Sequence, residues 1–190
     1  MSNTVKRSSL RSGSTLLEFV LAGSFIFLPQ LAGTASIGLS TLRAAEVAAL
    51  NRSAGHMFAA GVDFSQSANR NLLLKIAGSL NISDAGGQGV IILSEIDGTG
   101  VNHGVIARRI TIGNSAQRAS SFGTPAGGLL DAAGKVTDLS SPSANADSFA
   151  AVVPLAQGDV FYVAEAYFST SDYDWTGVFT SGGIYTKCVF

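Results

Sequence analysis

The uncharged stretch FVLAGSFIFLPQLAGTASIGLSTL, residues 19–42, decides the fold that this sequence predicts. As a helix it would be about 36 Å long at ~1.5 Å per residue, enough to cross a hydrocarbon core of ~30 Å. Pro29 would kink this helix or open its hydrogen bonding locally. After Gln30 the stretch becomes more polar, and its small residues favour close packing between helices. We therefore expect a long N-terminal membrane-spanning helix.

The residues on either side of this stretch set its orientation and its limits. The preceding segment MSNTVKRSSLRSG, residues 1–13, contains three basic residues and no acidic one. Positive flanks favour the cytoplasmic side, so the rest of the chain is expected across the membrane. Residues beyond 42 are rich in Ala and Leu, which predicts that the helix continues to about residue 60 and stops at Gly61. The expected parts are a basic leader (1–13), a helix (14–60, with its span at about 19–42) and an extracytoplasmic head (61–190).

The head reads as an α+β domain with a mostly antiparallel sheet. A second helix is expected after a cap at Asp63 or Ser65, ending near Asn81. Glycine-rich turns, among them 98–100, then separate apolar runs of strand length, and a small hairpin is expected around 133–134 within a long loop at 119–147. In the second strand, period-two alternation places Ile106, Ile110 and Ile112 on one face. The expected strands are 90–97, 105–112, 149–153, 159–168 and 184–190.

Composition excludes several classes of function. The 190 residues suit one compact domain with an appendage, and only 13% are charged, against roughly 25% in typical soluble domains. A net charge of −1 lacks the positive surplus of a nucleic-acid-binding protein, so no nucleic acid is expected as a partner. Two His and one Cys are too few for a structural zinc site, and one Cys excludes an intrachain disulfide. No glycine cluster matches a phosphate-binding pattern, so we expect no catalytic, metal or cofactor site.

The junction RSG-STLLEF, residues 11–19, is the most informative motif. Gly13 precedes a small residue, Ser14; Glu18 follows as the fifth residue after the glycine and Phe19 as the sixth. A lone carboxylate in an apolar helix is costly and needs a partner. The pattern resembles the processing site of type IV pilin-like precursors, closest to the short-leader form of the tight-adherence (Tad) pilus family.

This resemblance implies a cut and an assembly contact. A prepilin peptidase would cleave between Gly13 and Ser14, and Glu18 would pair with the new N-terminal ammonium of a neighbouring subunit, with Phe19 taking part in docking. Cleavage would also remove three of the twelve basic residues, leaving nine against thirteen acidic ones, a side-chain charge of −4.

The second half of the chain narrows the resemblance to the TadE-like pseudopilins. The segments RITIGNSAQRASSFGTP (109–125), GDVFYVAEAYF (158–168) and GGIYTKCVF (182–190) carry it, with a V-x-E-x-Y pattern at 163–167. It implies a structural, non-enzymatic subunit made in the bacterial inner membrane and assembled with other pilin subunits at an inner-membrane assembly platform. Such a subunit would prime or cap a pilus that serves adhesion or secretion, and it would end at the pilus or cell surface. From the residues themselves, Glu165 is expected to have a structural role, either in an ion pair with an arginine such as Arg108 or Arg109 or as a solvated residue.

Two other interpretations stay open. A single-span, membrane-anchored binding or adhesion protein would need no cut, but it leaves Glu18 and its spacing from Gly13 unexplained. A secreted hydrolase with an ordinary signal peptide would be cleaved at the small residues around 32–35, but a charge such as Glu18 is unusual in a short apolar signal segment.

Overall fold

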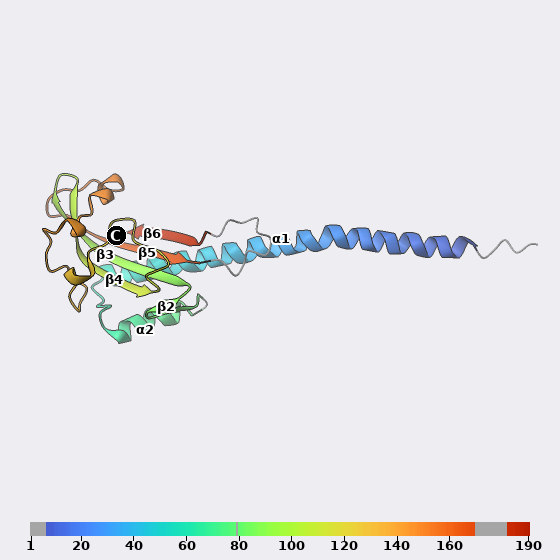
Figure 1. Ribbon diagram of the computed structural model, residues 1–190, viewed down its shortest axis with the longest axis horizontal. Coiled ribbons are helices and arrows are strands. Elements are labelled where there is room, and N and C mark those ends of the chain that lie inside the picture. The colour runs from blue at the N-terminus through green and yellow to red at the C-terminus, as the bar shows by residue number, and fades with distance from the viewer. Residues whose placement is uncertain (1–6, 79, 170–181) are drawn as a thin grey trace, which may run out of the picture. The chain divides into compact units, whose positions relative to one another are not determined.

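The computed structural model describes residues 7–78, 80–169 and 182–190, with side chains from residue 14 onward. It shows one long apolar N-terminal helix and an antiparallel sheet, as the α+β expectation requires (Figure 1). The chain divides into two compact parts, Met1–Leu42 and Arg43–Phe190. The boundary falls at the end of the predicted span, inside the helix.

Helix α1 runs from Arg7 to Ala59. It therefore begins within the predicted leader, before residue 14, while its end agrees with the expected limit near residue 60. Gly61 ends it at a φ of +85°, a left-handed conformation that glycine adopts without a Cβ penalty. The N–H of Val62 reaches back to the carbonyl of Met57 at 2.9 Å, and that of Gly61 to Phe58 at 3.0 Å, which is the Schellman ending of a helix.

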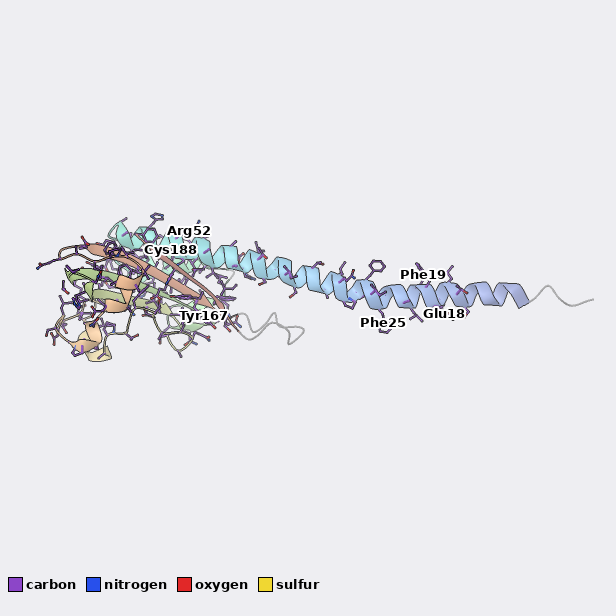
Figure 2. All side chains as sticks on the ribbon, turned by 90° about the horizontal axis from the view of Figure 1, so that it is seen from above. Glu18, Phe19, Phe25, Arg52, Tyr167 and Cys188 are labelled. Carbon is purple, nitrogen blue, oxygen red and sulfur yellow. The ribbon has the colours of Figure 1, made fainter. Side chains whose placement is uncertain are left out.

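The first half of α1 is apolar and exposed. The helical assignment passes through Pro29 without a break, although this residue has no N–H to donate to the carbonyl of Phe25. Phe19 and Phe25 are 78% and 79% exposed, and Figure 2 shows their side chains projecting from the helix. By length and composition, residues 14–59 are sufficient to cross a membrane, and the apolar window is not buried within the chain as a core helix would be. A signal sequence has these same properties.

Four strands form the sheet of the second part. They are β3 (Gly89–Gly100), β4 (His103–Gly113), β5 (Val160–Phe168) and β6 (Ile184–Val189). Their order is β4-β3-β5-β6, and every neighbouring pair is antiparallel. The sheet thus contains the expected strands at 90–97, 105–112, 159–168 and 184–190, with small changes at their ends.

Several local predictions for the head are wrong. Helix α2 covers Ser67–Ile76 and ends before Asn81, and its N-cap is Gln66 in place of Asp63 or Ser65. The Asp63 carboxylate instead accepts the N–H of Ser65 at 2.9 Å, which turns the chain two residues before the helix.

Two further predictions change in the strand region. The segment expected as a strand at 149–153 lies largely in a 3-10 helix, Asp147–Ala151, and Gly98–Gly100 extends β3 so that the turn falls at 101–102. The small hairpin near 133–134 is present, with Leu130 bridged to Val136. Two short strands, β1 (Ile82–Ser83) and β2 (Gly86–Gly87), had no signal in the sequence. Shorter 3-10 turns at Gly127–Leu129 and Pro142–Ala144 complete the long loop.

The sheet separates two cores. On one face, the end of α1 packs through Val47, Leu50, Ala54 and Phe58 against alternate residues of the strands, and we call this the helix-side core. On the other face lies the loop-side core, which the segment between β4 and β5 covers. Its buried members are Ile96, Ile106, Phe122, Val136, Ala144, Ala146, Phe149, Leu155 and Val163. β3 is therefore buried along most of both faces.

A β-bulge interrupts the alternation of side chains that was predicted for β4. Arg108 pairs with Glu95 while Ile106 pairs with Ile96, so Ala107 is an extra residue without a partner in β3. Side chains before the bulge therefore change face relative to those after it. Ile110 belongs to the helix-side core, whereas Ile106 belongs to the loop-side core, so the expectation of one shared face is wrong.

Candidate functional site

The predicted processing junction lies within helix α1. Gly13, Ser14, Glu18 and Phe19 are all helical, and residues 1–6 of the expected leader fall outside the described residues. A protease that binds an extended substrate would need the turn around Gly13 to unwind, which glycine eases because it is a poor helix former. The expected cut thus falls directly after the poorest helix former of this turn.

Glu18 is the one acidic residue in the first 45 positions of the sequence. Its side chain is exposed, and its Oε1 accepts the hydroxyl of Ser14, one helical turn earlier, at 3.2 Å. Among residues with described side chains no cation is paired with it. The neutral hydroxyl of Ser14 donates a hydrogen bond to one carboxylate oxygen but does not compensate the negative charge. In hydrocarbon this carboxylate would therefore still need a cationic partner.

A second polar site lies on the loop side of the sheet, around Glu165. Its side chain is 1% exposed, and its carboxylate takes hydrogen bonds from two segments that are distant in sequence. Ser121 donates both its N–H (2.9 Å) and its hydroxyl (2.7 Å) to Oε1, the Ser120 hydroxyl donates to Oε2, and the Tyr185 hydroxyl donates to Oε1. Alternation along β5 put Glu165 on the face of Phe161, Val163 and Tyr167, and the structure confirms that.

The arginines near Glu165 differ from the expectation in one respect. Arg109 is on the same face, 5% exposed, and donates to the carbonyl of Gly123 at 3.0 Å. Burial lowers the pKa of Arg109 to about 10, and the charge of Glu165 opposes this shift. Arg108 lies on the opposite face, where its Nε is 3.7 Å from Glu95 and its guanidinium stands 5.6 Å from the ring centre of Phe58. Glu165 therefore has a charged neighbour in Arg109, but its direct bonds come from hydroxyls and an amide.

Burial and hydrogen bonding act on Glu165 in opposite directions. Burial raises the pKa of its carboxyl, while the bonds from Ser120, Tyr185 and Ser121 lower it, and the net pKa is below the ordinary 4.5. Burial and the adjacent carboxylate together raise the pKa of Tyr185 to about 12. At neutral pH the site is thus an ionised carboxylate surrounded by donors, with no second carboxylate or imidazole among the residues bonded to it.

The remaining chemistry-bearing residues have structural neighbours. The His56 ring packs on Phe190 with centroids 4.5 Å apart, and His103 is 3.3 Å from the Asp147 carboxylate. Cys188 lies beside Asn51 of α1, and the Nδ2 of Asn51 is 3.6 Å from the Sγ of Cys188. Within the described residues, no group of three or more His, Cys, Asp or Glu side chains is placed to hold a metal ion.

A small hollow at the outer side of β4 also involves charged residues. It has a volume of about 200 Å³ and includes Arg70 and Asp131 in its lining. Arg70 is bound to Asp84 at 2.8 Å, and the Asp131 carboxylate accepts the N–H groups of Ala133 and Lys135. Both charges are therefore used in holding local structure.

Sequence reasoning missed the serines and the tyrosine that bind Glu165. The residues come from a loop without periodicity and from the final strand, so no spacing in the sequence links them.

A search of protein-family models, of curated proteins and of solved structures finds no match for the chain.

Proposed function

We propose that this chain is a structural minor pseudopilin, processed by a prepilin peptidase and assembled into, or priming, a pilus of the Tad or type IV-like kind. In this proposal residues 1–13 are the leader, the exposed apolar part of α1 is the membrane and assembly element, and the α+β head is extracytoplasmic. The protein is then inserted in the bacterial inner membrane with its N-terminus in the cytoplasm, before moving to the pilus or cell surface.

One observation carries the proposal, namely the lone carboxylate on the exposed apolar helix. Glu18 lies five residues after Gly13, and its carboxylate accepts a hydrogen bond from the neutral hydroxyl of Ser14. Cleavage before Ser14 would create an ammonium group at the same end of the helix. A neighbouring copy or another pilin subunit would then supply the positive charge that an apolar environment requires.

The surface of α1 supports assembly through the helix. Large apolar side chains between residues 16 and 42 are exposed in this chain, so they need lipid or other helices around them. The more polar part after Gln30 has Gly33 and Gly38, where an added Cβ would meet no side chain within 4 Å. Such open positions allow neighbouring helices to approach closely.

The test is the N-terminal sequence of the membrane-extracted full chain, expressed with and without a Tad-type prepilin peptidase. The proposal predicts a start at Ser14 only when the peptidase is present. Gly13→Leu should block the cut because a bulky residue replaces the open one before the scissile bond. Gly23→Leu, a matched change within the apolar part of α1, should still be cleaved.

The other outcomes separate the competing interpretations. A start at Met1 in both samples would reject processing and favour a single-span anchor for an extracytoplasmic binding protein. A start near Ser36 would identify an ordinary signal peptide and overturn the pseudopilin proposal.

A further inference from the structure

The contacts of Glu165 join three separate segments of the head. The carboxylate belongs to β5, its serine donors come from residues 120–121 in the long loop, and Tyr185 belongs to β6. Tyr185 and Ser121 also approach each other, with their oxygens 2.9 Å apart. One buried carboxylate is therefore the common acceptor for a loop and a strand that are not neighbours in sequence.

The loop segment held by Glu165 also closes one end of the loop-side core. Phe122, which directly follows the bonded serines, is 2% exposed and packs edge-on against Phe149 with ring centres 5.2 Å apart. The Lys187 ammonium of β6 stands 5.3 Å from the Phe122 ring, and Arg118 stands 3.9 Å from the Tyr185 ring. Release of the serines would thus weaken the packing of Phe122 in the loop-side core and its contact with β6.

We propose that Glu165 is an acid-sensitive latch: its ionised carboxylate fastens residues 120–123 to the sheet and holds the Tyr185 hydroxyl of β6, and protonation releases both. This inference concerns the head alone and does not depend on the proposed pilus function.

The chemistry of the acceptor explains the release. Four donor groups converge on two carboxylate oxygens, so a proton on either oxygen replaces an acceptor site with a donor. At least one of the buried donors then loses its partner, and an unpaired buried donor destabilises the folded contact. Because the pKa of Glu165 in the fold lies below 4.5, its ionised form stabilises the native structure. That stabilisation is fully present above about pH 4.5 and is lost as the pH falls through the folded pKa.

The charged groups that face Glu165 are basic side chains. On the same face they are Arg109 of β4, Lys187, its cross-strand partner in β6, and Arg118 of the loop. β3 contributes the neutral Ile92 opposite Glu165. Glu165 is thus the acidic group at this site, and the proposed change with pH comes from its carboxyl.

Hydrogen exchange of the full-length protein in detergent micelles tests the latch. Protection of the peptides that cover residues 118–125 and 184–190 is measured from pH 7 to pH 3, after correction for the intrinsic exchange rate at each pH. The Ser121 N–H reports directly because it donates to Glu165. The loss of protection depends on how far the pKa of Glu165 in the released state exceeds its pKa in the folded state. For each unit of this difference, the wild-type protein should lose about tenfold protection in these peptides. Peptides of α2 and of the end of α1 should stay protected.

Substitutions make the assignment specific. Glu165→Gln, which has the shape of the carboxylate without its charge, should show the low-protection state already at pH 7 and no further dependence on pH. Glu95→Gln is the matched control, since Glu95 is also in the sheet but lies on the opposite face beside Arg108. Its exchange at residues 118–125 should follow the wild-type profile.

A milder variant keeps the test decisive if Glu165→Gln does not fold. Ser121→Ala retains the carboxylate but removes a hydroxyl donor, so it should move the midpoint of release upward toward pH 4.5. The latch is rejected if residues 118–125 keep their protection to pH 3, if the whole head opens at the same pH, or if Ser121→Ala leaves the midpoint unchanged.

Discussion

Gly55 determines how closely α1 approaches the sheet. A Cβ at this position would overlap the ring of Phe190 and lie 3.0 Å from the Cβ of Ala164 in β5. One turn earlier, Asn51 is fully buried and donates from its Nδ2 to the Ala164 carbonyl at 3.1 Å. Because Gly55 has no side chain and Asn51 bonds to β5, α1 packs closely against β5 and against Phe190.

Gly55→Ala is expected to destabilise the head although alanine is the better helix former. Its methyl group must displace the Phe190 ring, and overpacking of this kind costs about 1–3 kcal/mol, more than the ~1 kcal/mol gained in helix propensity. Thermal unfolding of the detergent-solubilised protein, followed by near-ultraviolet circular dichroism, should show a melting temperature lower by several degrees. Gly38→Ala, in an open part of the same helix, should not lower it, because its methyl group meets no neighbour. An equal fall in the melting temperature of both variants would contradict the packing argument.

At the scale of elements, the bulge at Ala107 lets one strand serve two cores. Its carbonyl accepts the N–H of Val136 at 2.9 Å, so the extra residue also ties β4 to the hairpin that covers its outer edge. Arg108 continues this contact through a bridge to Lys135. The bulge thus changes the facing of side chains and protects an edge that would otherwise be open.

Deletion of Ala107 should therefore leave the sheet intact. The shortened strand would form a regular ladder in which Ile106 and Arg108 keep their partners, at a cost of about 1 kcal/mol for the lost bond to Val136. Deletion of Thr111 should prevent folding, because it forces Ile110 or Ile112 out of the helix-side core. Denaturant unfolding of the two purified variants checks this difference. A head that tolerates both deletions equally would show that register is not fixed by these isoleucines.

The elements that were predicted correctly are those with a strong apolar pattern. The helix through residues 19–42 is a long uncharged run whose length indicates a helix. β3 and β5 are nearly uncharged runs, and burial of their side chains favours the same strands that their pattern indicates. The segment at 149–153 was misjudged because Phe149 fills the loop-side core from a 3-10 turn, so its apolar character did not require a strand.

The polar site was predictable only in part. Alternation placed Glu165 on a definite face, but the identity of its donors depends on where the loop returns to the sheet. The bulge had a similar effect on Ile106, because one extra residue in β4 puts its side chain on the other face, and no local property of Ala107 indicates this. Contacts set by tertiary packing therefore cannot be predicted from the periodicity of the sequence.

At the scale of the whole molecule, Glu18→Ala tests whether the apolar helix assembles through its carboxylate. Removal of the charge should preserve or improve membrane insertion, while the share of the protein in sheared pili should fall on the order of tenfold or more because the neighbour's ammonium loses its partner. Immunoblots of membrane and sheared-pilus fractions from a strain that makes Tad pili give both quantities.

Glu46→Ala provides the control for this experiment. Glu46 is the next acidic residue along α1 and bonds Arg43 at 2.8 Å, so its loss should not affect incorporation. Unchanged pilus incorporation of the Glu18 variant would contradict the assembly role of this residue.

The double burial of β3 has a consequence for how the sequence can change over time. Substitutions in the loop that covers one face meet the loop-side core, while the residues that receive α1 point to the other side of the same strands. The sheet thus separates the covering loop, whose sequence can vary, from the face that packs against α1, whose residues must be kept. A library of random variants should tolerate exchanges at exposed positions of 114–158 far more often than at Val47, Ala54 or Gly55, so this head can acquire a new exterior without rebuilding its attachment to α1.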